Sequence, residues 1–198
     1  LVSTQFGTLL VGAVLGPAAA GLYAVARQVG EAALKPSRFL TPALYPELAR
    51  LRALGDLPGL RALLRRVLRL SALGSAGLLV GLAVLGLPLL RLIGGAEAVP
   101  AYPVMLLLAA GAAIGFGGFA LEPLLMSVGR QGVALRARLA ATVVFLGVGV
   151  PLLRWVGLEG AGMAALLSAA VLFGWQAVAA RRWLARESAA VGAPVAAN

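Results

Sequence analysis

The chain has 198 residues, of which 61% are hydrophobic and only 12% are charged, and its formal net charge is +10. A soluble domain typically carries about 25% charged residues, so this composition excludes an ordinary soluble protein and predicts an all-α, polytopic membrane protein. Cysteine and histidine are both absent, which excludes disulfides, thiolate or imidazole catalysis and the usual zinc and copper ligands. The cations lack interleaved aromatic residues or a recognition motif, which argues against nucleic acid as a partner.

Hydrophobic runs follow one another along the chain. They cover approximately residues 2–15, 18–45, 70–90, 102–128, 139–155 and 160–180. Because a hydrocarbon core of ~30 Å needs about 20 apolar residues per helix, we predict about six transmembrane helices within a bundle of residues 1–187. The first run is short and the sequence lacks an initial Met, so we expect the C-terminal part of a longer protein. The Ala/Gly/Pro-rich residues 188–198 are predicted to be a disordered tail.

The second run contains four ionisable residues, Arg27, Glu31, Lys35 and Arg38, and two expected kink sites, Pro36 and Pro42. On a helix the four ionisable residues fall within an arc of about 80°, so they form one face, which we call the charged stripe. Charges at bilayer depth cost at least ~2.5 kcal/mol each and persist mainly where they face a bundle interior or a watery cavity. We therefore predict that the stripe lines a cavity. Its excess of cations favours a phosphate or diphosphate as the bound group.

A second interpretation of the charged stripe stays open at this stage. Arg27 and Glu31 have the spacing of an i,i+4 ion pair, while Lys35 and Arg38 have long side chains that can reach the cytoplasmic headgroups. This interpretation accounts better for Arg38 than for Arg27, which lies farther from the inner end of the run. Glu122, in the fourth run, is another acid expected inside the bundle, where it pairs with a cation of the charged stripe, relays protons or lies near the inner interface.

Residues 47–69 combine six arginines with leucines at helical spacing. This pattern predicts a basic amphipathic helix on the cytoplasmic membrane surface. Asp56 to Gly59 is predicted to be the turn that begins it, with Asp56 as the cap and Pro58 early in the helix.

Arginines are distributed unevenly between the connections. Those after the second and fourth runs and in the tail are Arg50, Arg52, Arg61, Arg65, Arg66, Arg69, Arg130, Arg136, Arg138, Arg181, Arg182 and Arg186. The connections after the third and fifth runs contain only Arg91 and Arg154. By the positive-inside rule, this asymmetry predicts alternating spans with the C-terminus in the cytoplasm.

Small residues recur at four-residue spacing at Gly12/Gly16, Gly77/Gly81 and Gly111/Gly115. Such pairs allow close contact between helices in lipid, and we interpret them as packing positions.

Four segments carry a resemblance to a known family. The residues Gly16–Ala26 contain the pattern G-L-Y-x-x-A, and Pro42–Ala49 read P-x-x-x-P-x-L-A. These segments, together with Pro123–Arg130 and Gly157–Ala164, resemble the polysaccharide and O-antigen flippases of the multidrug/oligosaccharidyl-lipid/polysaccharide exporter superfamily. The resemblance implies two six-helix bundles around a central cavity, of which this chain is the C-terminal half.

The resemblance implies transport of an undecaprenyl-diphosphate-linked saccharide by alternating access, in a bacterial inner membrane and for lipopolysaccharide or another surface polysaccharide. It assigns the diphosphate to cavity cations, here Arg27, Lys35 and Arg38, with Glu31 beside them. It implies no catalytic residue, metal or cofactor, and it names the lipid bilayer, the lipid-linked oligosaccharide and the missing N-terminal half as partners. Three alternatives remain: an ion-coupled multidrug exporter using Glu31 and Glu122, a membrane glycosyltransferase or polymerase, and a non-catalytic assembly subunit.

Overall fold

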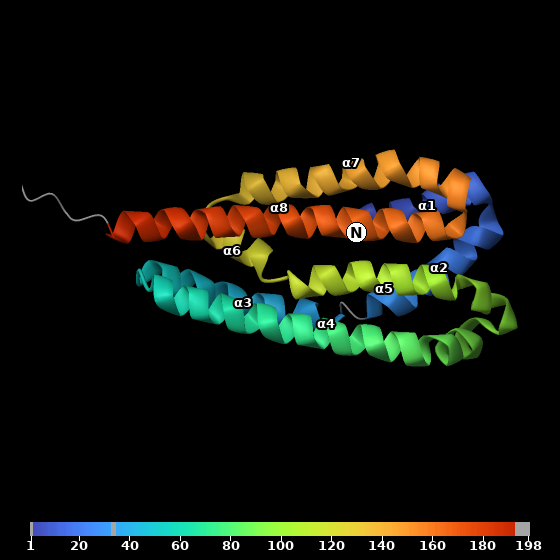
Figure 1. Cartoon of the computed structure of the whole chain (residues 1–198), viewed down its shortest axis with the longest axis horizontal. Coiled ribbons are helices and arrows are strands. Elements are labelled where there is room, and N and C mark those ends of the chain that lie inside the picture. The colour runs from blue at the N-terminus through green and yellow to red at the C-terminus, as the bar shows by residue number, and fades with distance from the viewer. Residues whose placement is uncertain (1, 33–34, 193–198) are drawn as a thin grey trace, which may run out of the picture.

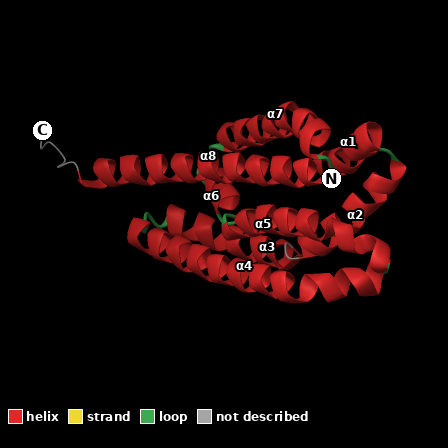
Figure 2. Ribbon diagram, turned by 45° about the vertical axis from the view of Figure 1, so that its right-hand side comes forward, coloured by secondary structure: helices red, strands yellow, loops and turns green. Residues whose placement is uncertain are grey.

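The computed structural model describes the backbone of residues 2–32 and 35–192, and the elements within these ranges are all helices (Figure 2). They are α1 Val2–Leu15, α2 Pro17–Ala32, α3 Lys35–Ala53, α4 Leu57–Gly94, the 3-10 helix η1 Ala96–Ala101, α5 Tyr102–Gly117, α6 Leu121–Ser127, α7 Gln131–Val156 and α8 Leu158–Gly192. The predicted all-α class is confirmed.

The helices form two layers that share one long axis (Figure 1). The first layer contains α1, α7 and α8, and the second contains α3, α4 and α5, with α2 running from the α1 turn to the side of α5. The most extensive helix contacts join α7 to α8, α8 to α5 and α5 to α4. Helix α8 therefore connects the two layers.

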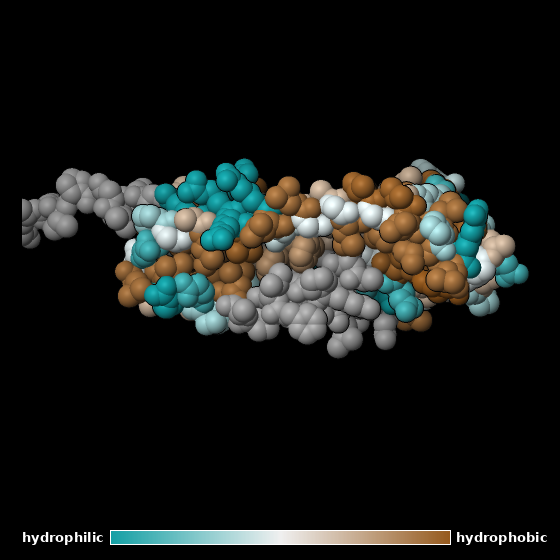
Figure 3. All heavy atoms as spheres, turned by 90° about the horizontal axis from the view of Figure 1, so that it is seen from below, coloured by the Kyte–Doolittle hydropathy of each residue, from teal (hydrophilic) through white to brown (hydrophobic). Residues whose placement is uncertain are grey.

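The two ends of the bundle differ in charge. The α3–α4 and α6–α7 connections and the C-terminal part of α8 lie at one end, which we call the arginine-rich end (Figure 1). The α1–α2, α4–α5 and α7–α8 connections lie at the opposite end. Hydrophilic residues gather toward both ends of the face in Figure 3, and hydrophobic residues lie between them. This distribution is typical of a bundle that crosses a bilayer.

Four described segments are long and apolar enough to cross a membrane. They are Leu57–Gly94, Ala96–Ser127, Gln131–Val156 and Leu158–Glu187. The predicted count of six is not confirmed among the described residues, because α1 has 14 residues and α2 has 16, fewer than the about 20 that a full span requires.

Residues 47–69 do not form the separate surface helix that the sequence pattern predicts. They are divided between the end of α3 and the beginning of α4, which continues without a break to Gly94. Two of the leucines in the pattern are buried inside the bundle. Leu60 and Leu64 share a core cluster with Leu48 of α3 and Trp183 of α8, and the partly buried Leu57, Leu63 and Leu68 pack against this cluster. Neighbouring helices therefore cover the apolar face.

The predicted turn at Asp56 is confirmed. The Asp56 carboxylate accepts a hydrogen bond of 2.8 Å from the Gly59 backbone N–H, and Pro58 lies in the first turn of α4. This cap satisfies one of the backbone donors that a helix N-terminus leaves without a partner. Proline is tolerated there because a backbone N–H in the first helical turn has no acceptor within the helix, so its absence costs no hydrogen bond.

Other predicted boundaries shift by a few residues. The second hydrophobic run is divided into α2 and α3, with residues 33–34 outside the described chain. Pro36 falls in the first turn of α3, and Pro42 lies within this helix. Helix α8 extends to Gly192, past the predicted boundary at Ser188, and residues 193–198 lie outside the described chain.

Several arginines at the arginine-rich end join helices to one another. The Arg52 guanidinium donates to the backbone carbonyl of Ser127, and that of Arg61 donates to the carbonyl of Leu184 at 2.9 Å. These bonds attach α3 to the end of α6 and α4 to α8. Within α3, Arg50 pairs with Glu47 at 2.7 Å, and its hydrogen bond lowers the pKa of the Glu47 carboxyl.

The predicted glycine pairs contribute unequally to helix packing. A Cβ at Gly111 would lie 3.5 Å from the Cα of Leu166, so α5 and α8 are close there. Gly77 and Gly81 have open space around their Cα atoms, on a face of α4 that no described helix covers. The tightest backbone approach is at Gly160 in α8, where a Cβ would overlap the carbonyl oxygen of Leu152 in α7.

We predict that Gly160→Ala destabilises the bundle by about 1–3 kcal/mol, because α7 must move to relieve the overlap. Gly77→Ala is the matched control, since the added methyl group meets nothing within 4 Å. Thermal unfolding of the intact protein in detergent measures both. Equal midpoints for the two variants would contradict the α7–α8 contact described.

Candidate functional site

A cavity of about 500 Å³ lies between α1, α2, α5, α7 and α8, and we call it the charged cavity. Its polar lining consists of Tyr23, Arg27, Glu31, Arg138, Thr142 and Ser168. Apolar side chains such as Leu108 and Phe145 form most of the remaining wall. Charged groups inside a largely apolar bundle are expected mainly at functional positions.

The packing of α2 turns its charged face toward this cavity. Ala26 and Val29 are buried, and a Cβ at Gly30 would lie 3.1 Å from the backbone nitrogen of Ala109 in α5. The absence of a side chain at Gly30 lets α2 lie directly against α5. Residues four apart share a helix face, so Arg27 and Glu31 together point away from this contact.

Tyr23 continues the same face of α2 by one turn. The side chain is only 2% exposed, and a Cβ at Gly7 would lie 2.8 Å from its hydroxyl oxygen. Helix α1 therefore accommodates the Tyr23 ring by having glycine at this position. The ring forms part of the wall of the charged cavity, one helical turn from Arg27.

The structure describes the side chains of two of the four residues of the charged stripe. Arg27 and Glu31 line the cavity, and both side chains are partly buried. The backbones of Lys35 and Arg38 belong to α3, but their side chains lie outside the described residues. The structure thus brings two of the four stripe residues to one cavity.

Glu122 pairs with Arg138 of α7, which is not one of the cations of the charged stripe. Its two carboxylate oxygens accept hydrogen bonds from one guanidinium nitrogen, Nη2 of Arg138, at 2.7 and 2.9 Å. The Glu122 side chain is 25% exposed and the Arg138 side chain is 62% exposed. This ion pair joins the first turn of α6 to α7, and it holds Arg138 at the edge of the charged cavity.

Sequence reasoning did not identify Arg138, Thr142 or Ser168 as cavity residues. It treated Arg138 as a loop cation, whereas α7 begins at Gln131 and places Arg138 inside a helix. The four-residue spacing of Arg138 and Thr142 was a signal that could have placed both on one face. Ser168 offered no comparable signal, because a lone serine in an apolar helix commonly bonds to its own backbone, as here to Ala165 at 2.9 Å.

The cavity can bind polar groups without covalent chemistry. Arg27 and Arg138 provide guanidinium donors, and the hydroxyls of Thr142 and Ser168 donate to carbonyls of their own helices, which leaves oxygen lone pairs as acceptors. Within the described residues, acidic side chains do not gather into a group able to hold a metal ion. Recognition of an anionic or hydroxyl-rich molecule is the chemistry that these groups provide.

A family model described as "Polysaccharide biosynthesis protein" matches residues 1–102. The chain belongs to this family. The match contains α1, α2 and therefore Arg27 and Glu31, while the α7 and α8 residues of the cavity lie beyond it. No solved structure matches the chain.

The chain is also similar to a curated relative, "Inner membrane protein YghQ" from Escherichia coli (strain K12). The two are 41% identical over 100 residues, which cover 50% of this chain and 27% of the relative. The match therefore spans about a quarter of the relative's length. Together with the four apolar helices, this similarity supports a multi-pass protein of the inner membrane for this member of the polysaccharide biosynthesis family.

We predict that the charged cavity contains water, and cysteine labelling can test this because the 198 residues contain no cysteine. Ser168→Cys should react with a membrane-impermeant thiol reagent in open membrane vesicles, since it lines the cavity. Val84→Cys is the control. Val84 is 68% exposed on an apolar span of α4 and should be shielded by lipid. Equal protection of both positions would show that lipid or protein fills the cavity.

Proposed function

We propose that this chain forms one wall of a transporter that moves an undecaprenyl-diphosphate-linked saccharide across the bacterial inner membrane by alternating access. The cargo would serve the biosynthesis of a surface polysaccharide such as the O-antigen of lipopolysaccharide. The observation that carries the proposal is the position of Arg27 and Glu31, which line a cavity of an apolar bundle with Arg138 at its edge. Membership of the polysaccharide biosynthesis family supports the same class of cargo.

The chemistry of such a cargo suits the cavity. A diphosphate requires several N–H donors, and a guanidinium group presents a planar set that matches phosphate oxygens. Arg27 lies on α2 and Arg138 on α7, so the two can approach an anion from different helices. The hydroxyls of Thr142 and Ser168 suit the sugar part, which consists mainly of donors and acceptors. Transport breaks no covalent bond and needs no nucleophile.

The helix order is compatible with six passes in this proposal. Helix α1, the α2–α3 pair, α4, the η1–α6 segment, α7 and α8 alternate in direction along the long axis (Figure 1). With the arginine-rich end in the cytoplasm, the C-terminus is cytoplasmic as well. An N-terminal bundle would supply the facing wall of the cavity.

An ion-coupled multidrug exporter is less well supported by the geometry. Both oxygens of Glu122 accept hydrogen bonds from Arg138, so this acid is engaged in an ion pair.

We expect Arg27→Ala to reduce surface polysaccharide display at least ~10-fold in a complementation assay, because charge-assisted hydrogen bonds contribute about 1.5–3 kcal/mol. Lys35→Ala should also reduce the display. Arg38→Ala is the third variant, so that each cation of the charged stripe is tested. Arg27→Lys should retain part of the display, because it keeps the charge and loses only the planar donors. Arg91→Ala is the matched control and should leave the display unchanged. Arg91 lies in the last turn of α4, at the end of the bundle opposite the arginine-rich end.

Immunoblots of the membrane fraction must show equal protein for each variant. Normal display in all of the stripe variants would contradict the proposed site and restore the interpretation that these side chains only reach lipid headgroups.

A further inference from the structure

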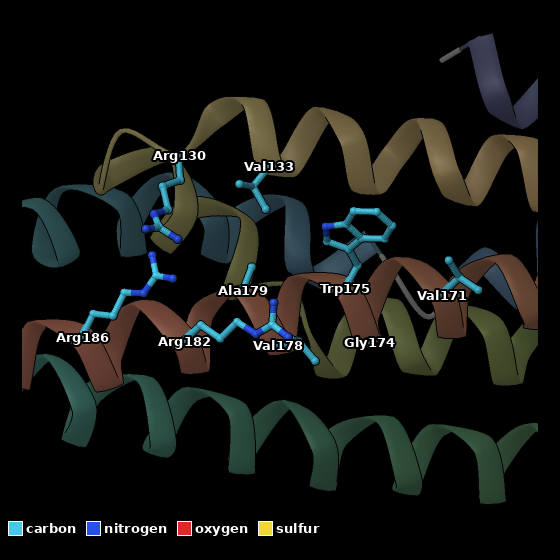
Figure 4. A pocket seen from close by; sticks show the side chains of 9 residues that line it. All are labelled: Arg130, Val133, Val171, Gly174, Trp175, Val178, Ala179, Arg182 and Arg186. Carbon is cyan, nitrogen blue, oxygen red and sulfur yellow. The ribbon is translucent and has the colours of Figure 1, made fainter.

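A second pocket, of about 490 Å³, lies between the beginning of α7 and the C-terminal half of α8 (Figure 4). We call it the basic pocket. Three arginines, Arg130, Arg182 and Arg186, line it at the arginine-rich end of the bundle. Trp175 and Val178 continue its wall toward the middle of α8. The basic pocket and the charged cavity have no lining residue in common.

Among the described residues that line the basic pocket, three are arginines and none is acidic. In Figure 4 the guanidinium groups of Arg130 and Arg186 point toward each other across the gap between α7 and α8. The ion pairs that join Arg50 to Glu47 and Arg138 to Glu122 lie elsewhere, and no described carboxylate lines this pocket. Facing guanidinium groups repel each other, so this arrangement is stabilised when an anion lies between them.

The pocket changes from charged to apolar along α8. Arg186, Arg182, Val178 and Trp175 follow at spacings of three or four residues and so form one helix face. Trp175 is 46% exposed and Val178 is 47% exposed, which leaves an uncovered apolar strip directly beside the cations. A soluble anion would satisfy the arginines but would leave this strip bare.

We propose that the basic pocket binds an anionic phospholipid, with the phosphate between Arg130 and Arg186 and an acyl chain along Trp175 and Val178. Basic pockets between transmembrane helices on the cytoplasmic side are suited to anionic headgroups, and tryptophan favours the membrane interface. The site uses other residues than the proposed transport site. Its assignment to the inner leaflet rests on the cytoplasmic C-terminus of the proposed function. Its function is to attach the α7–α8 pair to the inner leaflet.

Native mass spectrometry of the intact protein tests the proposal. The protein is released from vesicles that contain equal phosphatidylglycerol and phosphatidylcholine, and the retained lipids are counted. We expect phosphatidylglycerol to be enriched at least ~10-fold on the unmodified protein, and the enrichment to be lost in Arg130→Gln/Arg186→Gln. The matched control is Arg65→Gln/Arg66→Gln, which removes the same charge from exposed positions on α4 at the same end. It should retain the enrichment.

Three outcomes would overturn the proposal. If both double variants lose the phosphatidylglycerol enrichment equally, the lipid is attracted by surface charge in general and not by this pocket. Displacement of the lipid by millimolar inorganic phosphate would indicate a site for a soluble anion. Unchanged enrichment in Arg130→Gln/Arg186→Gln and in the single variant Arg182→Gln would place the lipid elsewhere. Thermal unfolding in phosphatidylcholine alone checks folding, and Arg182→Gln replaces the double variant if the latter does not fold.

Discussion

The cost of placing charge inside an apolar bundle is the constraint on which this structure depends. A guanidinium or carboxylate in hydrocarbon must find water, an opposite charge or a polar ligand. Helix α2 meets this requirement by packing its apolar face on α5 at Gly30 and directing Arg27 and Glu31 into the charged cavity. Glu122 meets it through its ion pair with Arg138.

The basic residues of this chain have at least three different environments. Arg52 and Arg61 donate to backbone carbonyls and join helices at the arginine-rich end. Arg27 and Arg138 line the charged cavity. Arg130, Arg182 and Arg186 surround the basic pocket, where no described carboxylate compensates them. A net charge of +10 therefore does not describe one binding surface, because these arginines lie in separate parts of the bundle and make different contacts.

Local patterns in the sequence predicted local features well. The helical class, the Asp56 cap and the position of Pro58 follow from composition and short-range chemistry, and the structure confirms them. Residues 47–69 are divided between α3 and α4 and do not form one separate helix. An amphipathic pattern indicates that one face is apolar but not what covers it, and here residues of α3 and α8 pack against that face. The Arg138–Glu122 pair and the basic pocket depend on contacts between separate helices, which periodicity does not encode.

The central claim is that Arg27 provides positive charge to an anion inside the charged cavity. Direct binding of a polyprenyl diphosphate to the intact protein in nanodiscs, measured by calorimetry for the unmodified protein and for Arg27→Gln, is the most direct test. Loss of one charge-assisted hydrogen bond should weaken the affinity about 10–100-fold. Equal dissociation constants for the two proteins would contradict the account.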